Sequence, residues 1–227
     1  TLVIRASARG ASLPAVLHRP ASLKRGPAVL WIDRGGRDGL PHPELALLLQ
    51  KGLQVLSLDC FATGSQVPLP GAPARDPDAD FFETYNRTDC AERVYDITVA
   101  ATWLASRKET RGLALFGTGE GGLWSLLAAP FAPRVDALAA DFGQLDLSDD
   151  QAFAGELYTP CLRRAGAFTT SLVLTAPRRL FLFNTGRRFD EGPVTGADRA
   201  AEAVAQLKLH RDLPSFVETA GWLASRG

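Results

Sequence analysis

The fold of this chain is decided by one stretch near its middle, Leu113-Ala-Leu-Phe-Gly117-Thr-Gly119-Glu-Gly121-Gly122. The stretch opens with a short apolar run, as expected of a strand that is buried on both faces of a sheet. A glycine-rich turn follows, and the apolar residues from Leu123 to Ala129 predict a helix. We therefore expect a strand, a sharp turn and a helix, with Gly119 at the tip of the turn.

On both sides of this turn, apolar strands alternate with amphipathic helices, which is the pattern of βαβ units on a mostly parallel sheet. The chain should open with an antiparallel hairpin, Leu2–Ala6 and Ala15–His18, with its turn at Arg9-Gly10. The other strands are expected at residues 27–33, 53–59, 112–116, 137–141, 179–184 and 207–210. The other helices are expected at 43–50, 88–107, 197–206 and 215–225, with one or two more between 149 and 176. We expect about eight strands and six helices in one domain, residues 1–227.

Residues 62–80 interrupt this pattern. They are rich in Gly, Pro, Ala and Asp and show no periodicity. A loop of this length in a compact domain is commonly functional or mobile. We expect a lid-like loop there.

Composition excludes several classes of partner. Lys and Arg together number 25, as do Asp and Glu, so the formal net charge is zero. A nucleic-acid-binding protein normally shows a basic excess, and no apolar run approaches the length of a membrane span. We expect neither a nucleic-acid partner nor a membrane association, and the oligomeric state is left open.

No signal-peptide pattern opens the chain, which begins at Thr1 and contains no methionine. This beginning favours a processed or excised piece of a longer protein, and the compartment stays undetermined.

The cysteines indicate neither a disulfide framework nor a zinc site. There are three, Cys60, Cys90 and Cys161, with no Cys-x-x-Cys spacing. Each lies in an apolar or helical context, so buried, inert thiols are expected. We expect no metal and no cofactor.

The central turn resembles the nucleophile elbow of α/β hydrolases, in which a strained residue between two glycines carries the nucleophile. A dinucleotide-binding fold also uses a glycine-rich turn before a helix. It places that turn after its first strand, with an acidic residue about 20 positions further on. Asp141 does lie about that far after Gly121. The turn comes after several strands, however, and this order favours the hydrolase.

The resemblance extends over nearly the whole chain and is nearest to the acetyl-xylan-esterase-like and dienelactone-hydrolase-like carboxylesterases. Residues 27–33 with Gly35-Gly36 resemble the family's strand and His-Gly-Gly turn, although Asp33-Arg34 replaces the usual His-Gly start. Asp59 and Gly64 match the family's Asp-x-Arg-Gly-x-Gly-x-Ser run, from which Phe61, Ala62 and Gln66 depart. The turn at 117–122 is similar to Gly-x-Ser-x-Gly-Gly and lacks only the serine.

The resemblance also implies roles for individual residues. Gly119 stands at the nucleophile position without a nucleophilic atom, and the N–H groups of Glu120 and of Arg34 or Gly35 would form the oxyanion hole. The family places its acid after the strand expected at 179–184, where Asp190 is the first candidate and Asp141 the second. It places its base before the terminal helix, where His210 is the candidate. Aspartates are common in loops, and a histidine on an edge strand is often structural. Asp33 and Arg34 could form a local ion pair or line the rim of the pocket.

Three functions remain open at this point. The chain is a pseudo-hydrolase, kept as a scaffold or as one domain of a longer protein. Alternatively, it is a carboxylic ester hydrolase in which the serine has been replaced. In the third possibility, the chain keeps a pocket in which Glu120, Asp190 or His210 carries out non-hydrolytic chemistry or binds a small ester or acyl ligand. Ester hydrolysis in this fold needs an activated oxygen or sulfur nucleophile, a base and preorganised N–H donors.

Overall fold

The computed structural model describes residues 1–6, 10–71, 75–76 and 79–225. Its centre is one eight-stranded sheet in the order β1-β2-β4-β3-β5-β6-β7-β8. The first two strands pair antiparallel with each other, and β2 pairs antiparallel with β4; every other neighbouring pair is parallel. The predicted, mostly parallel sheet is confirmed.

The strands lie close to their predicted positions. They are β1 (Leu2–Ala6), β2 (Ala11–His18), β3 (Gly26–Ile32), β4 (Gln54–Leu58), β5 (Thr110–Gly117), β6 (Ala137–Asp141), β7 (Arg179–Phe183) and β8 (Leu207–Leu209). The predicted hairpin is confirmed, although Arg9 of its expected turn is outside the described residues. Central strands are apolar because both faces are covered: Leu30 and Ile32 of β3 face one core, and Val29 and Trp31 face the other.

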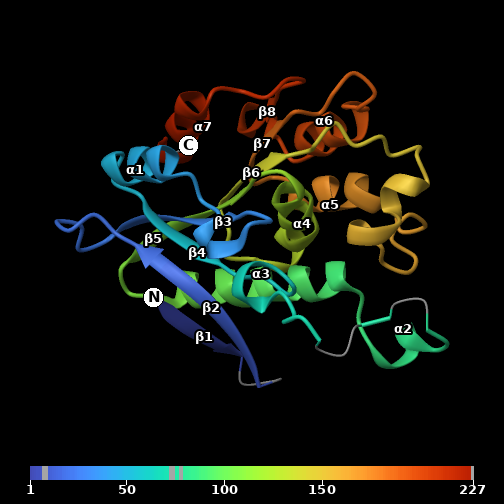
Figure 1. The fold of residues 1–227 in the computed structure, drawn as a ribbon. Coiled ribbons are helices and arrows are strands. Elements are labelled where there is room, and N and C mark those ends of the chain that lie inside the picture. The colour runs from blue at the N-terminus through green and yellow to red at the C-terminus, as the bar shows by residue number, and fades with distance from the viewer. Residues whose placement is uncertain (7–9, 72–74, 77–78, 226–227) are drawn as a thin grey trace.

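Helices cover both faces of the sheet (Figure 1). One core lies beneath α3 (Asp89–Ser106), α4 (Glu120–Ala128) and α5 (Ala167–Thr175), and α6 (Gly192–Ala200) packs against α5. The opposite core lies beneath α1 (His42–Gln50) and α7 (Phe216–Ala224). A further short helix, α2 (Phe82–Tyr85), follows the expected lid-like loop. Within the described part of that loop, only a 3-10 turn at Gly64–Gln66 is regular.

Two predictions need correction. The helix expected at 197–206 is α6, which begins earlier because Asp190 Oδ1 accepts a hydrogen bond from the Gly192 N–H at 2.9 Å and Pro193 suits a first helical turn. It ends before Glu202, whose φ of +55° interrupts the helix.

Cys60 and Cys90 are buried as expected, but Cys161 is exposed, because it lies in the turns before α5 and not inside a packed element.

Among the described residues, no helix combines the length and the apolar character needed to cross a membrane.

Candidate active site

The predicted strand, turn and helix are present as β5, the turn at Gly119 and α4. Gly117 is in register with Ile32 of β3 on one side and Ala140 of β6 on the other, so the turn leaves the middle of the sheet at its carboxyl edge. Gly119 itself has φ +53° and ψ −134° and is exposed to solvent. This backbone conformation is strained for any residue except glycine. The tip of the turn therefore has the geometry of a nucleophile elbow without a nucleophilic side chain.

Packing explains three of the glycines around this tip. A Cβ at Gly117 would overlap the backbone of Gly121 and Gly122, and a Cβ at Gly121 would overlap the carbonyl of Ile32. At Gly122 it would overlap the backbone of Asp141. These three residues let α4 approach β3 and β6 closely. A Cβ at Gly119 would meet nothing within 4 Å, so only backbone conformation restricts that position.

Two carboxylates flank the turn. Asp33 directly follows β3, and its Oδ2 accepts the hydroxyl proton of Thr118 at 2.7 Å. Asp141 ends β6, is 8% exposed, and its Oδ2 accepts a hydrogen bond from the Gly119 N–H at 3.3 Å. Its other oxygen, Oδ1, accepts from Asn184 Nδ2 and from the Gly143 N–H, both at 2.8 Å. Of the two acid candidates, Asp141 is therefore the one that contacts the elbow.

Thr118 has a part in the site that the sequence did not reveal. Its Oγ1 donates to Asp33 and accepts a hydrogen bond from Trp31 Nε1 at 3.0 Å. The hydroxyl nearest to the tip is thus held between two neighbours. A signal was present, because Asp33 and Thr118 each follow a strand, and the carboxyl ends of parallel strands meet at one edge.

The predicted oxyanion-hole residues lie together beside the tip. The Gly35 N–H donates to Asp33 Oδ1 at 2.8 Å, so this amide is engaged within its own turn. Arg34, in the loop after β3, forms an ion pair with a residue distant in sequence: its Nη1 donates to Oε1 of Glu120, the first residue of α4, at 2.6 Å. Partial burial raises the pKa of Glu120, but hydrogen bonds from its own backbone N–H and from Arg34 outweigh that effect, and the pKa is lowered. Glu120 is therefore an anion that is engaged with a cation.

The loop after β3 is held by hydrogen bonds to Asp59, which with Gly64 matches the Asp-x-Arg-Gly-x-Gly-x-Ser run of the carboxylesterases. The Asp59 side chain is fully buried and accepts from the Arg37 N–H at 2.8 Å and the Ser65 N–H at 3.1 Å. A Cβ at Gly36 or at Gly64 would overlap its carboxylate. Asp59 thereby ties the turn at 33–39 to the start of the lid-like loop.

The other two candidates lie apart from these contacts. The His210 imidazole faces α7, where its Nε2 is 3.5 Å from Glu218 Oε1 and its ring packs edge-on against Phe181. Asp190 is exposed, and its carboxylate accepts a hydrogen bond from the N–H of Gly192, the first residue of α6. None of the contacts described for these two side chains reaches the Gly119 turn. The roles of base for His210 and of acid for Asp190 stay predictions.

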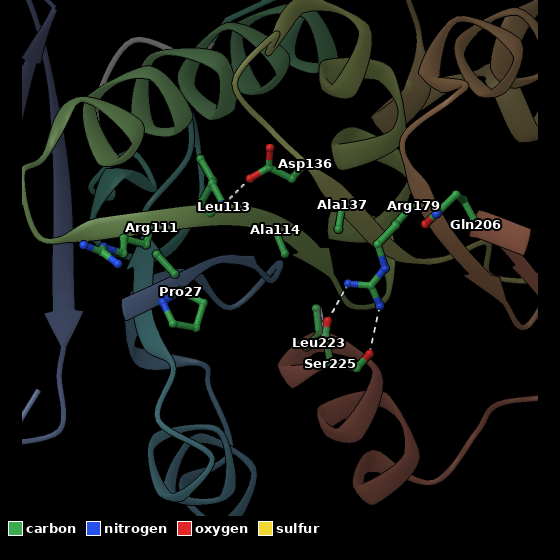
Figure 2. A pocket seen from close by; sticks show the side chains of 12 residues that line it. Pro27, Arg111, Leu113, Ala114, Asp136, Ala137, Arg179, Gln206, Leu223 and Ser225 are labelled. Carbon is green, nitrogen blue, oxygen red and sulfur yellow. Dashed lines mark hydrogen bonds between the residues drawn. The ribbon is translucent and has the colours of Figure 1, made fainter. Parts of the chain in front are cut away.

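A separate cavity of about 470 Å³ lies at the opposite, amino edge of the sheet (Figure 2). Its polar side chains serve the fold. Arg179 Nη2 donates to the Trp222 carbonyl at 3.1 Å at the end of α7, and Asp136 Oδ2 accepts from the Leu113 N–H at 2.8 Å. In this fold class ligands bind at the carboxyl edge, so this cavity is not the candidate site. Within the described part of the chain, no group of three or more His, Cys, Asp or Glu side chains is arranged to hold a metal ion.

No protein-family model and no curated protein sequence matches this chain. Solved structures do match. A Bacteroides fragilis protein provisionally assigned as an acetyl xylan esterase superposes with a TM-score of 0.70 at 15% identity, over 92% of this chain and 69% of its own. This chain has the α/β-hydrolase fold.

Two further structures show the same α/β-hydrolase arrangement. Acetyl xylan esterase 1 from Thermoanaerobacterium matches with a TM-score of 0.59 at 18% identity, over 95% of this chain and 79% of its own. Est1E from Butyrivibrio proteoclasticus, solved with ferulic acid bound, matches with a TM-score of 0.60 at 13% identity, over 99% and 96%. At these identities the likeness establishes the fold alone, and the activity has to be argued from the site.

Proposed function

We propose that this chain is a pseudo-hydrolase: a domain with the α/β-hydrolase fold, related to carboxylesterases, that lacks serine-hydrolase activity. It would serve as a scaffold, alone or beside a neighbouring domain of a longer protein. The observation that carries the proposal is Gly119, which occupies the tip of an otherwise complete elbow and provides no nucleophile.

Neighbouring hydroxyl groups do not replace the missing serine. Thr118 Oγ1 is held by Asp33 and Trp31. Ser125, one turn into α4, is fully buried and donates to the Gly121 carbonyl at 2.7 Å. A nucleophilic hydroxyl must face the substrate with a base in hydrogen-bond reach. Thr118 has a carboxylate in reach, Asp33, but its hydroxyl lies beside the tip of the turn and is also engaged by Trp31. Ser125 faces the protein interior and has only a backbone carbonyl as its partner.

The contacts of His210 support the proposal further. A catalytic histidine has to lie between the nucleophile and its acid. Here the imidazole faces Glu218, which also accepts from Lys208 Nζ at 2.6 Å. This arrangement favours a structural role for His210, holding β8 against α7.

The test is turnover of a short-chain aryl acetate by the chain as it stands, by Gly119→Ser and by Gly119→Ala. The alanine variant is the matched control, because it brings the same backbone strain without a hydroxyl. We expect no activity above background from any of the three and no labelling by a fluorophosphonate. Labelling of the unchanged chain would overturn the proposal.

One observation favours a second candidate, a carboxylic ester hydrolase that has lost its serine. The space above Gly119 is open, so a serine side chain would fit. If Gly119→Ser hydrolyses the ester while Gly119→Ala does not, an acid and a base must already be in place, and this candidate replaces the pseudo-hydrolase.

A further inference from the structure

A second cavity at the carboxyl edge, of about 600 Å³, lies where the loops after β6, β7 and β8 meet. This is the corner to which the resemblance assigns an acid and a base. Its charged lining consists instead of three arginines and two aspartates, with an amide beside them: Arg187, Arg188, Arg211, Asp146, Asp212 and Gln144. We call this cavity the arginine corner.

The backbone beneath the arginine corner is held in place by hydrogen bonds between the loops. The Gly186 N–H donates to the Arg211 carbonyl at 3.0 Å, and the Asn184 N–H donates to the Asp212 carbonyl at 3.1 Å. Arg187 and Arg211 therefore start from two paired stretches of main chain. Side chains mounted on a fixed backbone lose less freedom when a ligand binds, and this preorganisation favours affinity.

The three guanidinium groups differ in how closely each is paired with a carboxylate of the protein. Arg188 forms an ion pair with Asp146, whose pKa is lowered to about 2 by the Ser148 hydroxyl and N–H and by Arg188 itself. Among the described residues, the one carboxylate paired with Arg211 is that of Glu191, whose Oε1 lies 3.8 Å from Nη2. Arg187 forms no ion pair or hydrogen bond with any residue in the described ranges. Two cations in the corner are therefore available to a ligand.

Charge and size restrict what that ligand can be. The lining, with three arginines and two aspartates, carries one net positive charge, and Glu191 offsets part of it at Arg211 from outside the lining. This small excess suits a monoanion better than a dianion. A cavity of about 600 Å³ is far larger than an inorganic ion and falls within the usual range for small organic ligands. Gln144 Nε2 donates to Asn184 Oδ1 at 3.1 Å, which orients the amide, and the exposed Asp212 carboxylate can accept hydrogen bonds from hydroxyl groups.

We propose that the arginine corner binds a small hydroxylated carboxylate. Arg187 and Arg211 hold its carboxylate, and Gln144 and Asp212 bind its hydroxyl groups. The proposal goes beyond the loss of hydrolysis and does not depend on it, because no atom of the Gly119 turn takes part. Guanidinium groups are well suited to this task, since each presents paired donors to a carboxylate.

The test is calorimetric titration of the full chain with D-galacturonate, and with D-galactose as the neutral counterpart of the same shape. We expect galacturonate to bind and galactose not to bind. Arg187→Gln and Arg211→Gln should each weaken binding at least about tenfold, as expected when a charge-assisted hydrogen bond is lost. Arg199→Gln, at an exposed position of α6 outside the cavity, removes the same charge and should leave the affinity unchanged within about twofold.

A further variant tests the charge argument. Asp212→Asn raises the net charge of the corner from one to two, so inorganic phosphate should bind this variant more tightly than it binds the unchanged chain. Equal affinity for galactose and galacturonate would overturn the proposal. The proposal would also be overturned if Arg199→Gln lost as much galacturonate affinity as Arg187→Gln and Arg211→Gln, because general surface charge would then explain the binding. No detectable galacturonate binding at 50 mM, a concentration about fiftyfold above a millimolar Kd, would also refute it.

Discussion

The elbow and the arginine corner lie on the same edge of the sheet, yet they differ in which part of each is constrained. At the elbow the backbone is complete, and one side chain is missing, at Gly119. In the corner arginines line the cavity, while His210 contacts Glu218 and Asp190 contacts the start of α6. The difference has a physical cause. Gly117, Gly121 and Gly122 are constrained by the backbone atoms packed against them, whereas solvent-exposed side chains in the corner are restricted by few neighbours.

The largest expected effect is a change of stability with pH, and it arises at Asp96, a buried residue of α3 outside both regions. Burial of Asp96 on α3 raises its pKa to about 7, although its hydrogen bond from the Phe61 N–H at 2.7 Å opposes the shift. Because the folded state then holds a proton that the unfolded state releases near pH 4, the free energy of unfolding should fall as pH rises from about 4 to 7. The loss is on the order of 4 kcal/mol.

Chemical denaturation at a series of pH values measures this loss, with Asp96→Asn as the control that should remove most of it. The corner should behave differently, since Asp146 remains ionised above about pH 2. Galacturonate affinity is therefore expected to be constant between pH 5 and 8. If Asp96→Asn retains the full pH dependence, the assignment to Asp96 is wrong.

The next largest effect concerns the glycines that packing requires. Gly122→Ala should lower the free energy of unfolding by about 3 kcal/mol, because its Cβ would overlap the Asp141 backbone and β6 or α4 would have to move. Thermal unfolding measures the change. A variant as stable as the unchanged chain would show that the elbow backbone is not held by packing, and the contrast with the corner would fail.

A smaller effect is expected at the tip. Gly119→Ser should cost about 1 to 2 kcal/mol, the strain of placing a side chain at φ +53° without any steric overlap. Gly119→Ala should cost the same. A loss equal to that of Gly122→Ala would mean that space, and not backbone conformation alone, restricts position 119.

The smallest effect is expected in the corner. Arg188→Gln breaks the ion pair with Asp146, but the Arg188 side chain is 81% exposed, and exposed ion pairs contribute little to stability. We expect a melting temperature that is unchanged within about 2 °C, since a small ΔΔG gives a small shift in Tm. A shift as large as that of Gly119→Ser would show that the corner is as constrained as the elbow.

Much of the fold was predictable because its signals are local. The apolar run before Gly117 and the glycines after it predicted β5, the turn and α4, and every predicted strand was found. The boundaries of α6 were missed because the Asp190 carboxylate accepts a hydrogen bond from the N–H of its first residue, Gly192, and because its end is set by a left-handed residue, Glu202. The candidate site was predicted less completely, because Asp33, Thr118 and Trp31 are brought together only by the pairing of β3 with β5.

The amino-acid sequence by itself determined the order of the strands and the strand, glycine turn and helix around Gly119, since strand order and glycine spacing are properties of the chain. Only the tertiary structure decided which groups lie around that glycine. It placed Asp141 against the Gly119 N–H, turned His210 toward Glu218, and gathered Arg187 and Arg211 at one cavity. The physical reason is that backbone conformation follows from neighbouring residues, whereas contacts between side chains follow from how distant strands and helices pack.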